Sequence, residues 1–215
     1  MFFKEISPLL LNIPIVVSII AFTRYIIGFK TWRNYPTVAL ALAFYIVAKL
    51  NHNFIQSFFI WLILFVFIIG SASTFKYLIR KLKINYYARS AIVYLGGTIG
   101  AILSIYIVNL LFQFAYTDEF RVFSVALILS TIDEFGAVQL IKGNIEALRR
   151  TLTSFILGLL SGILLSSAWW NNVIYKNQWI LLLVLCLDFV VAFWSSLRLT
   201  ELSRFSAIIN RSKAD

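Results

Sequence analysis

The chain has 215 residues, of which 61% are hydrophobic and only 13% are charged. A water-soluble domain of this length cannot cover so much apolar surface with polar side chains, so the composition excludes an ordinary soluble globule. The net charge of +10 would suit a nucleic-acid-binding protein, but the basic residues fall in short clusters between long apolar runs, as in membrane proteins. We therefore expect a protein of the lipid bilayer that binds no nucleic acid.

Seven apolar segments approach the length of about 20 residues that a helix needs to cross a bilayer. In chain order they are 6–23, 35–50, 54–75, 91–116, 120–140, 152–170 and 178–197. The first lacks a small-residue cleavage site and ends at Arg24, so we expect it to be retained as a helix. The second is short and the fifth is interrupted by polar residues. Either could be re-entrant, which would leave six or eight crossings as alternatives.

The basic residues predict how these segments are oriented. Most of the 19 Lys and Arg residues fall at one alternating set of segment ends, and the other set has only Lys4, Lys49, Arg121 and Lys176. Because cytoplasmic loops carry the excess of positive charge, the basic set is expected in the cytosol. The fold class predicted is thus all-α: a multi-pass protein of the cell inner membrane with seven helices, its N-terminus outside and its C-terminus inside.

Tryptophans are expected at both boundaries of this membrane domain. Trp169, Trp170 and Trp179 lie around the loop between the sixth and seventh segments, near the outer boundary, and Trp32 and Trp194 lie near the inner one. Because the amphipathic indole ring prefers the membrane–water interface, we interpret all five as interfacial anchors.

The sequence divides into a transmembrane domain over residues 1–198 and a tail over residues 199–215. Leu199, Leu202 and Phe205 follow one helical face of the tail and alternate with charged residues. Such a pattern is typical of a basic amphipathic helix on an anionic membrane surface. A simple cytosolic extension of the seventh helix is the alternative.

Two segments carry glycines four residues apart, a spacing that lets helix backbones approach closely in lipid. The pairs are Gly96 with Gly100 in the fourth segment and Gly158 with Gly162 in the sixth. We expect these small residues to pack helices within the molecule, and the alternative is a homodimer face.

A short internal echo suggests a repeat. Residues 38–42 read Val-Ala-Leu-Ala-Leu and residues 125–129 read Val-Ala-Leu-Ile-Leu, three helices apart. With the predicted topology, helices one to three and four to six would run in opposite directions, as in inverted-repeat transporters. A 3+3 inverted repeat plus one helix is therefore an open alternative.

Three carboxylates interrupt the apolar segments, where an ionised group costs on the order of 2.5 kcal/mol or more. Asp188 lies midway along the seventh segment, and we expect its side chain to face the protein interior. Asp133 and Glu134 lie in the inner half of the fifth segment, shortly before Gly136. Because adjacent helical residues point about 100° apart, they cannot share one partner unless the helix unwinds there.

Arg24, at the inner end of the first segment, is the expected ion-pair partner of Asp133. Together with Asp188 and Glu134, these two residues are our candidates for substrate or ion binding. A soluble-type catalytic site is not expected, because the chain has one histidine, His52, and one cysteine, Cys186. A metal site built from several histidines or cysteines is likewise not expected, nor is any cofactor.

Two stretches of the sequence resemble a known family. Gly28-Phe29-Lys30-Thr31, with Pro36 and the Val-Ala-Leu-Ala-Leu-Ala run over 38–43, is similar to the entry to the second helix in a bacterial seven-helix membrane module. That module is usually fused to an inactive transglutaminase-like domain. Residues 124–135, ending in Thr-Ile-Asp-Glu-Phe, and the Glu-Ala-Leu of 146–148 resemble its second block. In that block Asp133 stands where the family has a glutamate, and Glu134 replaces a basic residue.

The proline-centred helices also resemble the membrane subunit of poly-gamma-glutamate capsule synthesis. In the seven-helix family, genes for ATP-grasp ligases of the glutamate-ligase type accompany the module. The resemblance therefore implies a non-enzymatic membrane subunit, a scaffold or conduit for a separate cytosolic ligase and its anionic product. The alternative function is a small proton-coupled secondary transporter, which the intramembrane carboxylates and the suggested repeat would favour.

Overall fold

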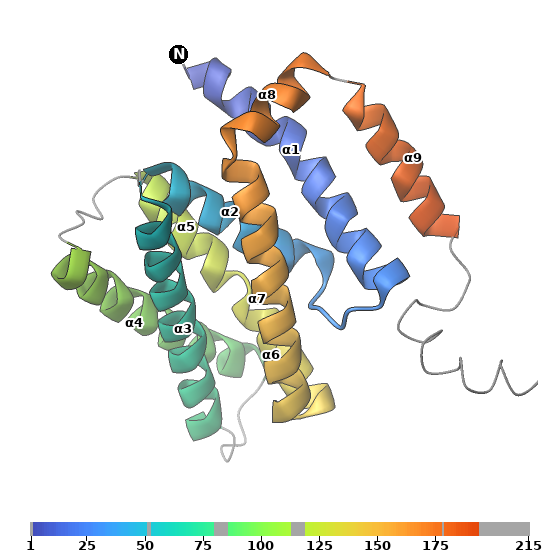
Figure 1. Ribbon diagram of the computed structural model, residues 1–215. Coiled ribbons are helices and arrows are strands. Elements are labelled where there is room, and N and C mark those ends of the chain that lie inside the picture. Colours follow the sequence, from blue (N-terminus) through green and yellow to red (C-terminus); the bar gives the residue numbers. More distant parts are fainter. Residues whose placement is uncertain (1, 51–52, 80–85, 113–118, 178, 194–215) are drawn as a thin grey trace, which may run out of the picture.

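The computed structural model describes residues 2–50, 53–79, 86–112, 119–177 and 179–193, and these residues are helical throughout apart from short connections (Figure 1). The helices are α1 (Phe2–Phe22), the π-helical turn η1 (Thr23–Ile27), α2 (Asn34–Leu50), α3 (Phe54–Ile79), α4 (Tyr86–Phe112), α5 (Glu119–Leu129), α6 (Ile132–Lys142), α7 (Asn144–Ser166), α8 (Ala168–Lys176) and α9 (Ile180–Phe193). The predicted tail, 199–215, and the predicted anchor Trp194 lie outside the described residues.

The membrane class predicted from composition is confirmed. Four described helical segments are long and apolar enough to cross a bilayer: Phe54–Ile79, Ala88–Phe112, Val122–Gln139 and Asn144–Ser166. Asn12–Ile27 and Ile180–Phe193 are shorter apolar helices. These six segments together with α2 follow the order of the seven predicted segments. The sixth helix differs from the predicted segment 152–170. Helix α7 begins at Asn144, and Trp169 and Trp170 lie on the separate helix α8.

Helix α2 occupies the centre of the bundle, where it packs against α7, α5, α3 and α1. Between Val38 and Val47, all residues except Leu42 are buried. Its 17 residues span roughly 26 Å at the rise of an α-helix. A segment surrounded by other helices contacts protein instead of lipid, which explains why this one tolerates a length below that of a typical membrane span.

Aromatic rings fill the space between α2, α3 and α7. The Trp61 ring stacks on Phe155 with centroids 4.2 Å apart and meets Phe44 edge-on at 5.4 Å. Trp32 is also part of this core, and its side chain is fully buried. The prediction that Trp32 is an interfacial anchor is therefore wrong, whereas Trp169 and Trp179 are exposed near the predicted outer boundary.

The glycine pairs lie at the two most extensive helix contacts of the molecule, α3 with α4 and α2 with α7. A Cβ atom added at Gly96 or Gly100 would clash with Phe75 or Ser71 of α3. One added at Gly162 would lie 2.9 Å from the Ala41 carbonyl oxygen of α2. Packing within the molecule is thus confirmed, and these faces are not free to form a homodimer contact.

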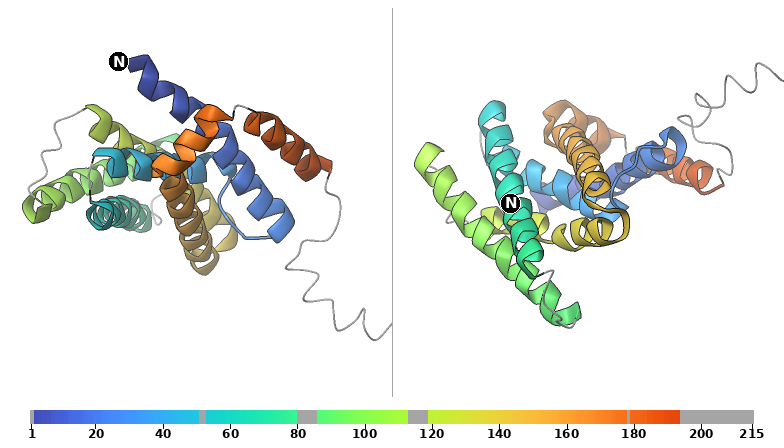
Figure 2. Two further views of the ribbon diagram at one scale, coloured as in Figure 1. Left: turned by 45° about the horizontal axis from the view of Figure 1, so that its top comes forward. Right: turned by 90° about the horizontal axis from the view of Figure 1, so that it is seen from below.

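The arrangement of the helices gives the suggested inverted repeat no support. In such a repeat, the contact of α3 with α4 would correspond to one of α7 with α1, yet α1 and α7 touch only slightly. Figure 2 shows α3 and α4 along one flank of the molecule and α9 on the opposite flank. Among the membrane helices, α9 makes its main contact with α1.

Candidate functional site

The loop between the first and second membrane helices is held by hydrogen bonds against the predicted inner end of the bundle. After the π-helical turn, Gly28 has a φ of 94°, which favours glycine, and its N–H donates to the Thr23 carbonyl. The Trp32 N–H donates to the Ser154 hydroxyl of α7 at 2.7 Å. With Thr31 and Trp32 buried, the loop is fastened to the core rather than free in solvent.

The fifth membrane segment is broken, as the sequence suggested, but at a different place. The break lies at Ser130 and Thr131, between α5 and α6, and not at Gly136, which lies inside α6. The Ser130 hydroxyl donates a hydrogen bond of 2.7 Å to the Leu127 carbonyl of the preceding turn. The Thr131 hydroxyl donates one of the same length to the Ile128 carbonyl. Such bonds compete with the backbone ladder of a regular helix, although similar bonds at Ser73 and Ser104 leave α3 and α4 unbroken.

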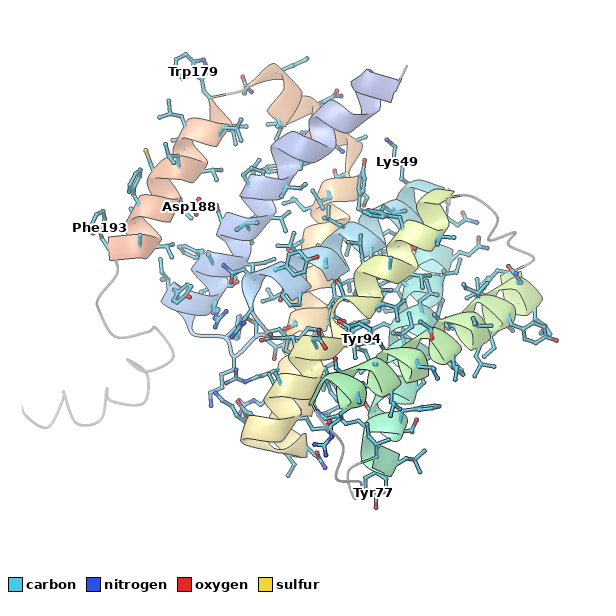
Figure 3. All side chains as sticks on the ribbon, turned by 180° about the vertical axis from the view of Figure 1, so that it is seen from behind. Lys49, Tyr77, Tyr94, Trp179, Asp188 and Phe193 are labelled. Carbon is cyan, nitrogen blue, oxygen red and sulfur yellow. The ribbon has the colours of Figure 1, made fainter. Side chains whose placement is uncertain are left out.

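Because α6 begins at Ile132, Asp133 and Glu134 lie in its first turn. The N-terminal end of a helix carries a partial positive charge, so it stabilises carboxylates at this position. The Asp133 carboxylate accepts a hydrogen bond of 2.7 Å from the Tyr94 hydroxyl of α4. Figure 3 labels Tyr94 where α4 passes α6.

Glu134 points to a different element. Its carboxylate accepts from the Arg33 backbone N–H at 3.3 Å, and its other oxygen lies 3.9 Å from Arg33 Nε. The two carboxylates therefore have separate partners, as their helical spacing requires. The predicted ion pair of Asp133 with Arg24 is wrong: Arg24 donates to the Trp32 carbonyl at 3.3 Å and lies over the Tyr25 ring.

A third acidic residue of the site, Glu146, lies in the first turn of α7. Its carboxylate accepts from Arg150 Nε at 3.1 Å and lies 4.0 Å from Lys30 Nζ of the loop. Glu146 is not among the site residues predicted from the sequence, because the sixth segment is predicted to begin only at residue 152. Glu146 and Arg150 are spaced i, i+4, the signal of a helical ion pair that would have extended the helix.

Lys76, near the end of α3, completes the contacts around α6 by donating to the Gly136 carbonyl. A Cβ atom at Gly136 would lie 3.2 Å from Lys76 Nζ, so the glycine leaves room for this amine. Gly136 thus lies within α6 beside the Lys76 amine and does not break the helix.

We define the inner-end cluster as the charged and polar residues where the loop, α4, α6 and α7 meet. Its members are Arg24, Lys30, Arg33, Tyr94, Asp133, Glu134, Glu146 and Arg150. In the loop the side chains of Lys30 and Arg33 are 50% and 81% exposed, whereas those of their partners Glu146 and Glu134 are 23% and 17% exposed. The cluster thus presents cationic groups to solvent and keeps two of its carboxylates withdrawn.

Asp188 does not belong to this cluster. It lies on α9, which has no buried residue among those described, and its side chain is exposed. The Asp188 side chain is therefore not enclosed by the protein, although it lies on the side of α9 that faces α1 (Figure 3). Nor does the described part of the chain contain a group of three or more His, Cys, Asp or Glu side chains that could hold a metal ion.

The two sequence blocks that suggested a family meet in the inner-end cluster. Residues 28–43 form the loop and α2, and residues 124–135 and 146–148 form the α5–α6 break and the start of α7. Packing of α2 against α5 and α7, together with the Arg33–Glu134 and Lys30–Glu146 ion pairs, brings the blocks together across about a hundred residues of sequence.

Comparison with known proteins confirms the resemblance. Residues 3–209 match the model of a family described as seven transmembrane helices usually fused to an inactive transglutaminase. Searches of curated proteins and of solved structures returned no match. Because the match spans nearly the whole chain, this multi-pass membrane protein belongs to the seven-transmembrane-helix family usually fused to an inactive transglutaminase.

Proposed function

We propose that the chain is a non-enzymatic scaffold in the cell inner membrane that docks a cytosolic amide ligase of the ATP-grasp type and its anionic product. The observation that carries this proposal is the outward-facing basic surface of the inner-end cluster. Lys30 and Arg33 extend from a loop whose neighbouring residues Thr31 and Trp32 are buried. A fixed loop presents its charges in a constant geometry, which lowers the entropy cost of binding.

Electrostatics supports an acidic partner on this side. Fields from clustered like charges attract an oppositely charged polymer or protein surface and speed its association. The Glu134 and Glu146 side chains pair with those of Arg33 and Lys30. Both carboxylates are less exposed than their basic partners. The accessible charge of these two ion pairs is therefore mainly positive.

The packing around α2 favours a scaffold over a conduit. The centre of the bundle is filled by Trp61, Phe44 and Phe155 in close ring contact. An anionic product would have to displace this apolar core to pass through it, since a charge in such surroundings is strongly disfavoured. We therefore place the binding function at the cytosolic surface.

A second candidate function, a proton-coupled secondary transporter, draws on one observation. The α5–α6 break with Asp133 and Glu134 in the first turn of α6 resembles the interrupted helices at transporter binding sites. A cavity of about 580 Å³ exists, but Asn53, Gln56, Phe59 and Phe112 line it at the opposite ends of α3 and α4. Its distance from the carboxylates weakens this candidate.

The test is to purify the full chain together with an ATP-grasp ligase encoded beside it. We expect the double variant Lys30→Gln, Arg33→Gln to retain several-fold less ligase, and higher salt to reduce retention by the unchanged chain. The matched control is Lys176→Gln, because Lys176 is exposed on α8 at the opposite end. Exposed ion pairs contribute little to stability, so the double variant should fold normally.

Two results would contradict the scaffold function. One is equal ligase retention by the double variant and by the control. The other is proton-driven uptake of a solute by vesicles that contain the purified chain alone, if uptake is lost in Asp133→Asn or Glu134→Gln. That second result would establish the transporter instead.

A further inference from the structure

Asp188 has an unusual environment for a carboxylate. On α9, the least exposed residues include Leu181, Val184 and Val191, whose spacing places them on one helical stripe with Asp188. Figure 3 shows Asp188 on the side of α9 that faces α1. Its side chain is nevertheless exposed, and within the described residues no hydrogen bond or ion pair reaches it.

The depth of Asp188 makes this exposure costly. Trp179, 79% exposed, precedes α9 at the expected membrane boundary. Asp188 follows nine residues later, which is about 14 Å along a helix axis. Half of the hydrocarbon core measures about 15 Å, so the carboxylate lies near the midplane. An ionisable group at this depth is normally paired or faces other protein.

The neighbouring helix offers no opposite charge at this level. From Asn12 to Phe22, α1 contains no charged residue, and neither does α9 apart from Asp188. A second copy that packed α9 against α9 would add another carboxylate, which repels the first. Charge complementarity therefore favours a partner that supplies a cation within the membrane.

We propose that Asp188 is the intramembrane docking point for a partner protein whose transmembrane helix carries a central Lys or Arg. Each charge alone is strongly disfavoured in lipid, and charged residues within membranes therefore usually pair with one another. The partner helix packs on the exposed surface of α9 beside α1. This inference does not depend on the cytosolic ligase, because it concerns a different face and a different class of partner.

A synthetic transmembrane helix tests the proposal. The probe is a Leu/Ala helix of about 23 residues with one central Lys and an acceptor dye, mixed with the full chain in phosphatidylcholine vesicles. The donor dye is attached at Cys186, the single cysteine of the sequence, which is exposed. Two residues correspond to about 200° around a helix, so the dye lies away from Asp188.

We expect energy transfer to show at least about tenfold tighter association with this probe than with the same helix lacking Lys. The reason is that an unpaired charge near the bilayer centre is strongly disfavoured, so the charged probe gains from pairing with Asp188. Asp188→Asn should abolish the difference, and Asp188→Glu should keep it. The unfolding temperature of Asp188→Asn should stay unchanged, because the side chain is exposed on a helix with no buried residue.

Equal association with both probe helices would overturn the proposal, and this comparison uses the unchanged chain, so it does not depend on how a variant folds. A probe with Lys near its end should bind no better than the uncharged helix, and stronger binding would also contradict docking at the midplane. If donor- and acceptor-labelled copies of the chain associate with each other and Asp188→Asn abolishes that association, the occupant is a second copy and the proposal fails.

Discussion

At the residue scale, the first turn of α6 determines how the two adjacent carboxylates are used. Asp133 accepts from Tyr94 and Glu134 pairs with Arg33, so neighbouring residues hold α6 to two different elements. The sequence predicted that they cannot share a partner, because adjacent helical residues point in different directions. It could not predict which partners, since these depend on how the loop and α4 approach α6.

Mutual dependence of Tyr94 and Asp133 is the first consequence. In a double-mutant cycle of Tyr94→Phe and Asp133→Asn, we expect a coupling of about 1 kcal/mol, the usual net contribution of one hydrogen bond. The matched cycle of Arg24→Gln with Asp133→Asn should be additive, because Arg24 binds the Trp32 carbonyl instead. Unfolding curves in detergent measure both. A stronger coupling to Arg24 than to Tyr94 would reject the observed pairing.

At the element scale, the glycine-bearing faces of α4 and α7 determine which helices pack together. Gly158 and Gly162 face Leu40, Ala41 and Phe44 of α2 at close range. In lipid, where no hydrophobic effect drives helices together, such close backbone approach supplies much of the attraction. Small residues on both sides, Ala41 opposite Gly162 for example, therefore stabilise the central position of α2.

Adding one methyl group at this interface should be costly. Gly162→Ala places a Cβ 2.9 Å from the Ala41 carbonyl oxygen and closer still to the Phe44 ring. We expect it to lower the free energy of unfolding by about 1–3 kcal/mol, as overpacked cores do. Gly70→Ala is the matched control, because a Cβ at Gly70 meets nothing within 4 Å. Thermal unfolding of both purified variants provides the measurement, and equal melting temperatures would contradict the packing role.

Patterns of this kind show what the sequence can predict. Hydropathy located the helices and glycine spacing marked their close faces, because both depend on chemistry local to a segment. The burial of Trp32 was not predicted, because a loop that folds into the core can have the same amino-acid composition as a loop at the membrane interface. The start of α7 was missed because Glu146, Arg149 and Arg150 resemble a charged loop, although the i, i+4 contact of Glu146 with Arg150 belongs to the helix.

At the scale of the whole molecule, polar networks lie at both ends of an apolar bundle. At the predicted outer end, the Asn12 amide donates to the Asn171 side chain at 2.7 Å and accepts from the Trp170 indole at 3.1 Å. These bonds tie α1 to α8. At the other end, the inner-end cluster joins the loop, α4, α6 and α7 through charged groups. The two ends therefore differ in chemistry, and the orientation of the chain decides which one meets the cytosol.

Orientation is tested by two cysteines in a Cys186→Ser background, one at Lys142 and one at Lys176. Both positions are exposed, Lys142 at the end of α6 and Lys176 at the end of α8. Because the positive-inside bias places the end of α6 in the cytosol, a membrane-impermeant maleimide should label Lys176→Cys in intact spheroplasts. It should label Lys142→Cys only after permeabilisation, which also serves as the control for reactivity. The opposite pattern would place the inner-end cluster outside the cell, where no cytosolic ligase could reach Lys30 and Arg33.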